Sequence, residues 1–466
     1  MLTYTLKKAP GVPLYEALYR AIRQDITEGR LPAGTKLPSQ RALAANLKVS
    51  KITVEAAYDH LSQEGYIRSY PKRGFFVEQT ELCRPRPRQP EGMPAEAPEA
   101  LPFDLTGSAP GDFPFTVWSR LERQVMLDMG TALLKPLPNQ GAPELRRAIA
   151  DHLFQFRGFR ADPENILVGA GTDFLYTLLV QILGRDKNYF VEEPGYGKIR
   201  SIYASAGARC MGVPLDDFGV SPESLMGADV LHISPSHHFP TGIVTPLPRR
   251  LELLQWAKTG GHYIIEDDYD SEFGFRSHPM PALAALDDGG RVIYMNTFSR
   301  SLAPALRVGY MVLPEDLMAK FRENLGFYGC TVSSFEQYTL ARFLSEGYFE
   351  KHINRMRKSY RTRRTEIRAI LENCPGRFAI LEQEAGVHFL LRLETLLSDE
   401  EIVKIWAEQG IRVRPLSRFF HGEVPEKAAH CLVISYASLP GDRLEALAEA
   451  LSKSFKRIWE KSGKIM

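Results

Sequence analysis

Hydroxyl and guanidinium side chains gather in one short segment of this 466-residue chain, in a spacing that suits an anion. Thr297 and Ser299 can donate hydrogen bonds to a phosphate, and Arg307 can add a charge-assisted clamp. A separate Gly-x-Gly-Thr turn, ending in Gly171 and Thr172, joins an apolar run to a helical pattern and offers backbone N–H groups and a hydroxyl. Each segment could bind a phosphate, although such a turn by itself is equally often a plain helix start.

Arg300 lies in the same segment, within Asn-Thr-Phe-Ser-Arg-Ser-Leu-Ala-Pro. A guanidinium has a pKa above ~12 and offers no free amine to attack an aldehyde, so this residue can pair with an anion but cannot form an imine. Asp267 and Tyr269 follow another apolar run, where an acidic cluster alone is usually a solvated loop or a helix start. Arg414 and Arg418, near the C-terminal end of the chain, are two further arginines that could bind a carboxylate.

Other chemistries have weaker support. His237 and His238 are expected to be structural or to line a polar rim, because no metal-ligand spacing accompanies them. The five cysteines are scattered without a C-x-x-C pair, which argues against a metal ribbon or a disulfide framework and fits a reducing cytosol. No signal peptide opens the chain, and the apolar stretches are too short to cross a bilayer. We therefore expect a soluble cytoplasmic protein without a metal.

Charge is unevenly placed along the chain. The net charge is only +2, but residues 1–78 contain 12 Lys/Arg and 7 Asp/Glu, so this segment carries +5 and the remainder −3. A basic module on a near-neutral body predicts a polyanion as the partner of that module, although charge alone fits an ordinary solvated surface about as well.

The elements that must position these residues follow from periodicity. Apolar spacing and helix caps predict helices over 13–28, 42–47 and 51–63, and residues 66–77 alternate around a Pro-Lys-Arg-Gly turn as two strands. A proline-rich linker is expected over 79–102.

From residue 103 onward, strand-like and helical segments alternate, which predicts an α/β layered domain. Strands are expected at 166–168, 188–191, 230–233, 263–265, 292–295 and 308–312. Long amphipathic helices follow over 334–374, with a break near Gly347, then strands at 378–381 and 388–393 and a last helix at 442–461. We expect a large part over about 103–345 and a smaller α+β part over about 346–466.

The first 78 residues resemble a GntR-type winged helix-turn-helix, on Ile26–Arg41, Val49–Val54 and Glu64–Ile67 among other matching positions. This resemblance implies binding to double-stranded DNA, with a recognition helix that presents its N-terminal turn to the major groove. Arg41 is the expected guanine reader. The other expected contacts, to phosphates, base edges or the minor groove, are Ser39, Ser50, Lys51 and Thr53 and, in the wing, Arg73 and Gly74. Taken singly, Ser39 and Ser50 are nearly as well explained as helix caps.

The remainder resembles the aminotransferase-like domain of MocR/GabR-type regulators, which fuse a GntR winged helix to a fold-type-I pyridoxal-phosphate fold. The resemblance implies a cofactor held by Gly171, Thr172, Tyr196, Asp267, Tyr269, Thr297, Ser299, Arg300 and Arg307. Tyr196 would lie against the ring, Asp267 would pair with the ring nitrogen, and Tyr269 with the ring hydroxyl. Members are homodimers in which a lysine forms the Schiff base. Here Arg300 holds that lysine's position, and Phe239 stands where transaminases usually have asparagine.

Three outcomes stay open for Arg300. It pairs with the phosphate of a noncovalently bound pyridoxal 5'-phosphate derivative, such as pyridoxamine phosphate or an amino-acid adduct. Alternatively, the pocket takes a different anion, or it is vestigial and serves as a dimer scaffold. We therefore expect a DNA-binding transcriptional regulator with a small amine or amino-acid-like effector and no enzymatic activity. The alternatives are an aminotransferase with an accessory DNA-binding domain and a ligand-independent DNA-binding dimer.

Overall fold

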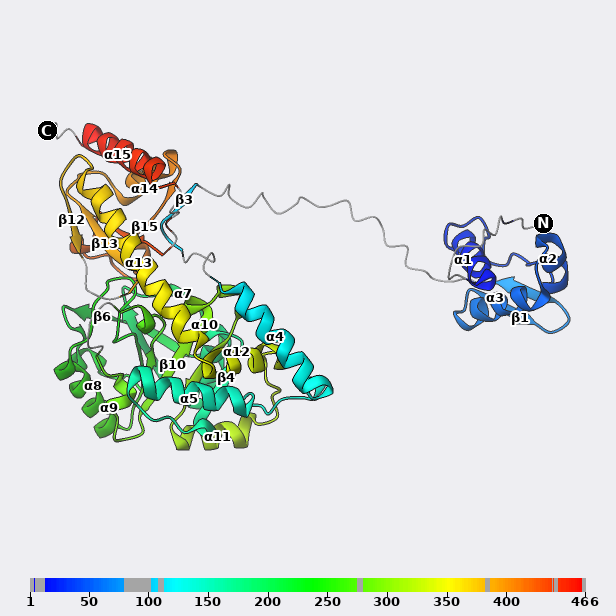
Figure 1. Ribbon diagram of the computed structural model, residues 1–466, viewed down its shortest axis with the longest axis horizontal. Coiled ribbons are helices and arrows are strands. Elements are labelled where there is room, and N and C mark those ends of the chain that lie inside the picture. The colour runs from blue at the N-terminus through cyan, green and yellow to red at the C-terminus, as the bar shows by residue number, and fades with distance from the viewer. Residues whose placement is uncertain are drawn as a thin grey trace. The chain divides into compact units, whose positions relative to one another are not determined.

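The computed structural model describes residues 4, 13–78, 102–107, 113–274, 280–381, 386–437, 439 and 443–462. The chain divides into two compact units, Met1–Glu99 and Ala100–Met466, which are described separately (Figure 1). The predicted linker, 79–102, lies outside the described residues apart from residue 102.

The first unit contains three helices and a β-hairpin. They are α1 (Leu14–Thr27), α2 (Gln40–Leu47), α3 (Lys51–Gln63) and the antiparallel strands β1 (Ile67–Tyr70) and β2 (Gly74–Val77). Apolar side chains at helical spacing form its core, because each helix is apolar on one face only. The predicted winged-helix arrangement is confirmed.

The second unit is built around an eight-stranded sheet with the order β4-β11-β10-β9-β8-β5-β6-β7. Strand β11 runs antiparallel to both of its neighbours and β7 is antiparallel to β6, whereas the other pairs are parallel. Residues of β4, β8 and β10 are buried throughout, which explains why these strands read as continuous apolar runs. The strands are β4 (Ile166–Gly169), β5 (Asn188–Glu193), β6 (Arg209–Asp216), β7 (Gly219–Val220), β8 (Val230–Ile233), β9 (Tyr263–Asp267), β10 (Val292–Thr297) and β11 (Gly309–Val312).

Helices surround this sheet, as Figure 1 shows for α5, α8, α9 and α11. The helices up to the small part are α4 (Phe115–Met129), α5 (Pro143–Arg157), α6 (Thr172–Leu183), α7 (Gly197–Ser205), α8 (Leu247–Gly260), α9 (Leu283–Leu286), α10 (Phe298–Ser301), α11 (Glu315–Leu325) and α12 (Ser334–Ser345). Gly347 adopts the left-handed conformation, with φ of 73°, and separates α12 from the long α13 (Tyr348–Glu372), so the predicted break is confirmed.

A smaller antiparallel sheet, ordered β12-β13-β16-β15, forms the C-terminal part with α13, α14 (Asp399–Glu408) and α15 (Leu444–Lys461) (Figure 1). Its strands are β12 (Phe378–Leu381), β13 (His388–Leu393), β15 (Arg414–Pro415) and β16 (Cys431–Ser435). The short β3 (Phe103–Asp104) pairs in parallel with β14 (Ile411–Arg412), so the start of this unit is joined to its C-terminal part. The α/β domain with a smaller α+β part is therefore as predicted. Within the described residues, no helix is long and apolar enough to cross a membrane.

Candidate functional site

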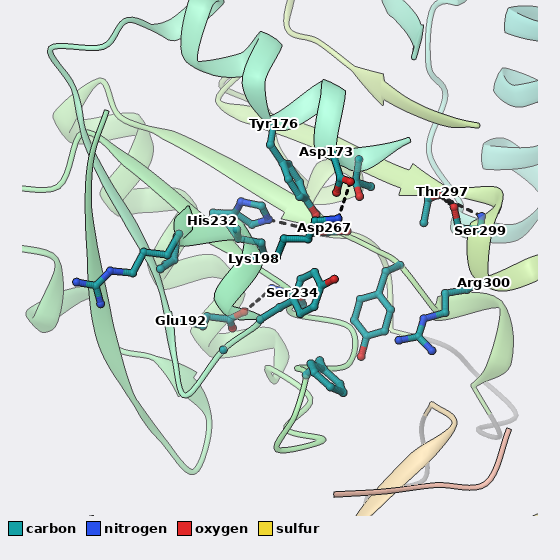
Figure 2. A pocket seen from close by; sticks show the side chains of 18 of the residues that line it. Asp173, Tyr176, Glu192, Lys198, His232, Ser234, Asp267, Thr297, Ser299 and Arg300 are labelled. Carbon is teal, nitrogen blue, oxygen red and sulfur yellow. Dashed lines mark hydrogen bonds and ion pairs between the residues drawn. The ribbon is translucent and has the colours of Figure 1, made fainter. Parts of the chain in front are cut away.

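A cavity of about 330 Å³ opens where the central strands of the eight-stranded sheet end (Figure 2). Its lining includes residues that end β5, β9 and β10 or begin α6 and α7. The carboxyl ends of parallel strands are the usual ligand site of such sheets, because loops diverge there and leave a crevice. All nine predicted cofactor residues except Gly171 line this cavity, namely Thr172, Tyr196, Asp267, Tyr269, Thr297, Ser299, Arg300 and Arg307.

Gly171 lies at one end of the cavity, directly before α6. Its φ is 78°, and a Cβ at this position would lie 2.7 Å from Nη2 of Arg307. Glycine is therefore required at position 171 for two reasons: the backbone is left-handed, and the guanidinium of Arg307 approaches closely. As a result, Arg307 lies over the turn whose backbone N–H groups begin α6, which concentrates positive charge at this end.

Asp173 joins the two cations of this end. Its Oδ2 is 3.1 Å from Nη2 of Arg307 and 2.6 Å from Nζ of Lys198. Partial burial opposes ionisation of Asp173, but the hydrogen bond and charge of Lys198, together with Arg307, lower the pKa of its carboxyl. Thus an internal carboxylate already bridges Arg307 and Lys198.

Thr297 ends β10 and caps the short helix α10. Its hydroxyl accepts the N–H of Ser299 at 3.2 Å and donates toward Oγ of Ser299 at 3.0 Å or the carbonyl of Val308 at 3.2 Å. The Ser299 hydroxyl lines the cavity and is thereby oriented as a donor. Thr297 therefore orients the Ser299 hydroxyl, in addition to lining the cavity itself.

Asp267 ends β9 and is only 5% exposed. Its Oδ2 accepts the hydroxyl of Tyr176 and lies 3.5 Å from Nε2 of His232, whose Nδ1 is 2.7 Å from the hydroxyl of Tyr203 (Figure 2). Its Oδ1 is buried without a hydrogen-bond partner among the described residues. A buried carboxylate oxygen without a partner is costly, so this atom indicates a missing donor, such as a protonated ring nitrogen.

A buried network supports the strand end that carries Asp267. The next residue, Asp268, is ion-paired with Arg157 at 2.7 Å and accepts the hydroxyl of Tyr294 at 2.6 Å. Arg157 also donates to Ser236 at 2.9 Å. Because removing one member of a buried pair leaves an uncompensated charge, this network fixes the position of the β9 end relative to neighbouring loops.

Tyr269 and Arg300 lie together beyond Asp267. Cζ of Arg300 is 5.9 Å from the centroid of the Tyr269 ring, and the Tyr269 hydroxyl is 3.3 Å from Nδ1 of His237. His237 is held in turn by Asp270 at 2.8 Å. Burial, followed by the charge of Asp270, raises the pKa of Tyr269 well above its ordinary value, so its hydroxyl stays protonated and can donate a hydrogen bond.

Arg300 and Arg414 also line a second, water-sized cavity of about 20 Å³ that adjoins the first. Arg418 lines a different adjoining cavity, which it shares with Arg414. Tyr196 is 46% exposed at the mouth of the first cavity, with its ring 6.3 Å from that of Phe239. Arg414 therefore lines both cavities that Arg300 lines, whereas Arg418 lines neither of them.

Glu192 also lines the first cavity, although the sequence did not indicate it as a site residue. Its Oε2 accepts the N–H of Ser234 at 2.8 Å and lies 3.7 Å from Nε2 of His238. Burial, against the opposing Ser234 hydrogen bond and with help from the Asp267 charge, raises the pKa of Glu192 to about 8. Burial also lowers the pKa of His238 to about 3, so a neutral histidine faces a carboxyl that is protonated at neutral pH.

In the first unit, the predicted DNA contacts lie on α2, α3 and the hairpin. Ser39 and Ser50 cap α2 and α3, with their hydroxyls accepting backbone N–H groups at 3.2 and 3.1 Å. Arg41 is exposed on α2, and Lys51 and Thr53 lie in the first turn of α3. Each serine is thus a helix cap in the free protein. The Ser50 hydroxyl also shares a hydrogen bond with the Thr53 hydroxyl at 2.8 Å, and either of the two can be the donor.

In the β1–β2 hairpin, which forms the wing, the guanidinium of Arg73 lies over two aromatic rings. Its Cζ is 6.0 Å from the Tyr70 centroid and 5.6 Å from that of Phe76, while Gly74 has φ of 101° at the turn. Ile52, which the sequence reasoning missed, is 76% exposed on α3 between Lys51 and Thr53. The signal was an apolar residue outside the buried face of that helix, where it could contact a thymine methyl group.

Asp173, Tyr176 and His232 were also missed in the sequence analysis. Asp173 directly follows the predicted phosphate turn, which was a usable signal, whereas Tyr176 and His232 lie in apolar segments and are recognisable only by what they contact. No cluster of three or more histidine, cysteine, aspartate or glutamate side chains suited to a metal occurs in the part of the chain that the structure describes.

Comparisons with known proteins agree with this geometry. Residues 103–451 match the family "Aminotransferase class I and II", and residues 14–77 match "Bacterial regulatory proteins, gntR family". The chain is 35% identical to the uncharacterized HTH-type transcriptional regulator YdeL of Bacillus subtilis, with 91% of this chain and 94% of YdeL covered. It is 33% identical to the probable rhizopine catabolism regulatory protein MocR of Rhizobium meliloti, with 98% and 97% covered.

Among solved structures, the chain resembles LysN, an alpha-aminoadipate aminotransferase from Thermus thermophilus in complex with N-(5'-phosphopyridoxyl)-L-leucine. The TM-score is 0.65 at 25% identity, and the match covers 79% of this chain and 94% of LysN. The match covers most of the LysN chain, so the two share the architecture of the sheet and of the C-terminal part.

Proposed function

We propose a function from the premise that this chain belongs to the aminotransferase class I and II family and carries a DNA-binding module of the gntR family. Its relatives of similar length are HTH-type transcriptional regulators, and the chain is a DNA-binding regulator with an aminotransferase-like domain. We infer that this domain receives an effector and joins two copies of the chain.

The ligand that we propose for the cavity is pyridoxal 5'-phosphate or a derivative of it, held without a covalent bond. The single observation that carries this proposal is the buried Oδ1 of Asp267, which lacks a donor within the described residues and would bind a protonated ring nitrogen. Thr172, Ser299 and Arg307 would hold the phosphate, and Tyr269 the ring hydroxyl. In enzymes that use it, such a group serves as an electron sink for amino-acid chemistry.

We further propose that the protein has no transaminase activity. Arg300 stands at the position where the family resemblance places the Schiff-base lysine, and arginine cannot supply the required amine. Lys198 also lines the cavity, but its Nζ is paired with Asp173 at 2.6 Å. Measurable turnover of amino acids to keto acids would favour the alternative, an enzyme with an accessory DNA-binding domain.

We propose a homodimer that binds paired DNA half-sites. Four large apolar side chains of α4 and the following 3-10 turn are exposed, with Phe115 at 73%, Met126 at 44%, Leu127 at 74% and Leu134 at 74%. Groups of neighbouring exposed apolar side chains are typical of protein interfaces, whereas single ones are common on any protein surface. Two winged helices on one dimer suit half-sites about one helical turn (~34 Å) apart.

We also propose that an effector binds through a carboxylate to Arg414 or Arg418. Such an effector would act by favouring one arrangement of the domains over another.

Absorption spectra test the ligand proposal. The purified protein and the variants Arg300→Lys and Arg307→Gln are titrated with pyridoxal phosphate. We expect saturable binding to the wild type without the absorption band of a covalent imine, that band only in Arg300→Lys, and weaker binding in Arg307→Gln. A covalent band in the wild type would show that another lysine has taken over this role, and no binding to any of the three proteins would overturn the ligand assignment.

Operator binding tests the regulatory proposal. A consensus site is selected from random duplex DNA by the full-length protein, and its affinity is then measured at fixed salt with and without pyridoxal phosphate. We expect the ligand to change the affinity in the wild type and to have less effect in Arg307→Gln. An unchanged affinity in the presence of bound ligand would favour the ligand-independent DNA-binding dimer.

A further inference from the structure

Ile52 is the most exposed large apolar side chain in the described part of the first unit. It is 76% exposed, and the other exposed large apolar residue of that part, Tyr70, is 37% exposed and donates its hydroxyl to Glu78 at 3.1 Å. Ile52 is the second residue of α3, whose buried face includes Val54 and Tyr58 instead. Single exposed apolar residues are common, so what Ile52 contacts has to be inferred from its position on the helix.

The first turn of α3 lies where a DNA-binding module contacts bases. Residues 14–77 match the gntR family, and α3 follows α2 after only three residues, as the second helix of a helix-turn-helix. In such pairs the N-terminal residues of the second helix contact base edges in the major groove. The neighbours of Ile52 are polar: Ser50 and Thr53 share a hydrogen bond at 2.8 Å, and Nζ of Lys51 lies 3.7 Å from Oε2 of Glu55. Ile52 is therefore an apolar group within a polar turn.

The major groove offers one apolar group that suits such a side chain. Every base pair presents hydrogen-bond donors and acceptors there, and thymine adds a 5-methyl group that the other three bases lack. Isoleucine can neither donate nor accept a hydrogen bond, so burial against this methyl group is the contact that it can gain from a base edge. A helix also restricts the χ1 angle of a β-branched side chain to essentially one rotamer, so Ile52 loses little freedom when DNA binds.

From the proposed DNA-binding role of α3, on which this step rests, we propose that Ile52 determines specificity for thymine at one position of each operator half-site. The contact is with the 5-methyl group and not with the hydrogen-bonding atoms of the base. Uracil presents the same hydrogen-bonding atoms as thymine and lacks the methyl group, so the two bases differ only in the part that Ile52 contacts.

Replacing single thymines of the selected operator by uracil tests this contact. The affinity of the full-length protein is measured by fluorescence anisotropy at fixed salt. In the wild type we expect one thymine of the half-site whose replacement weakens binding about fourfold, the effect of burying one methyl group. Ile52→Ser should bind the thymine and uracil operators equally well. Ile52→Val keeps a β-branched apolar side chain and should keep most of the discrimination.

A cytosine series gives an independent readout of the same contact. Cytosine replaces that thymine, with guanine opposite, and the operator is compared with and without a 5-methyl group on the cytosine. The methyl group should increase the affinity of the wild type and of Ile52→Val but not that of Ile52→Ser. The control is Met226→Ser, which removes an apolar side chain that is 91% exposed in the second unit and should behave as the wild type in both series.

Circular dichroism should show that each variant is folded, because Ile52 lies outside the core cluster of the first unit. If uracil has no effect at any thymine in the wild type, the thymine contact is wrong and the DNA-binding role of α3 still stands. A loss of affinity that persists in Ile52→Ser would assign the methyl contact to another residue. Failure of the protein to select any operator from random duplex DNA would overturn the DNA-binding role itself.

Discussion

Asp173 places an internal anion at the end of the cavity where we propose that a phosphate binds. Its carboxylate contacts Arg307 at 3.1 Å and Lys198 at 2.6 Å, so part of the positive charge of both residues is neutralised before a ligand arrives. In the proposed complex, a phosphate would compete with this carboxylate for Arg307. The affinity for the ligand would then depend on Asp173, which repels the phosphate, as well as on the residues that attract it.

Replacing Asp173 by asparagine removes the competing charge and keeps the side-chain size. We expect Asp173→Asn to bind pyridoxal phosphate roughly two- to fivefold more tightly, the range that corresponds to one solvent-accessible ion pair. Calorimetry at fixed ionic strength measures the change. Asp216→Asn breaks a surface ion pair with Arg249 and serves as the matched control. Weaker binding in Asp173→Asn would show that Asp173 organises the site instead of competing for it.

Glu192 makes the stability of the second unit depend on pH. The pKa of its carboxyl is raised to about 8 in the fold from an ordinary value of 4.5, mainly by burial. The folded state therefore binds a proton that the unfolded state has released above pH 4.5. The resulting stability is fully present below pH 4.5 and is lost as the pH rises toward 8.

We expect Glu192→Gln to remove this contribution, since an amide keeps the shape and does not titrate. The Tm of the variant relative to the wild type should rise between pH 5.5 and pH 8, by an amount equivalent to at most about 1.4 kcal/mol per pH unit. Thermal denaturation in matched buffers measures the difference, and subtraction cancels the groups that both proteins share. A difference that does not vary with pH would exclude a raised pKa for Glu192.

At the scale of the element, α2 and α3 each have one face buried in the core of the first unit and one face exposed to solvent. Leu43, Val54 and Tyr58 are buried in the core of the first unit, while Arg41 and Ile52 are exposed. Ser39 and Ser50 fix where the two helices begin, because each side chain accepts an N–H group of the first turn. The helix starts therefore determine which residues of α2 and α3 are exposed to solvent.

We expect Arg41→Ala to weaken binding to the selected operator about 10- to 100-fold, the range of one bidentate guanine contact, without changing thermal stability. Fluorescence anisotropy at matched salt measures the affinity. Arg20→Ala, which removes an exposed α1 arginine paired with Glu16, should retain most of the wild-type affinity. Unchanged operator binding in Arg41→Ala would show that another residue reads the base.

At the scale of the whole molecule, the proposed function gives the second unit two roles, ligand binding and dimer formation. Its main cavity lies at the strand ends, whereas Leu127 and Leu134 belong to the α4 region and are each 74% exposed. An isolated exposed leucine needs no explanation, but several on one helix and the turn after it indicate a contact surface.

We expect the double variant Leu127→Glu/Leu134→Glu to shift the protein from the mass of two chains to that of one in light scattering coupled to size exclusion. The two substitutions would bury four glutamates without partners in each dimer interface, and unpaired buried charges destabilise an interface strongly. Met226→Glu, at a residue that is 91% exposed on another element, should leave the mass unchanged. A dimer that persists in the double variant would place the interface elsewhere.

The helices, the winged-helix unit and most strands of the large sheet were predictable because their signals are local. Apolar spacing, caps and turn residues act within a few positions of the chain, so the break at Gly347 and the caps at Ser39 and Ser50 were visible in the sequence. Strands β3, β6, β7, β14, β15 and β16 were not predicted. The exposed, mixed pattern of β6 and the two-residue length of β3, β7, β14 and β15 provide little local signal, so these strands are defined by the strands that they pair with. Strand β16 is a buried apolar run of five residues, so its signal was present in the sequence.

The sequence by itself determined the kinds of residue that meet at the strand ends, since Asp267, Thr297 and Arg307 each follow a recognisable local motif. Only the tertiary structure decided how they combine. It placed Asp173 between Arg307 and Lys198, left Oδ1 of Asp267 without a donor among the described residues, and directed Arg300 away from Thr297 and Ser299. These contacts join residues far apart in the chain, and side-chain direction depends on packing around each one, which no local pattern contains.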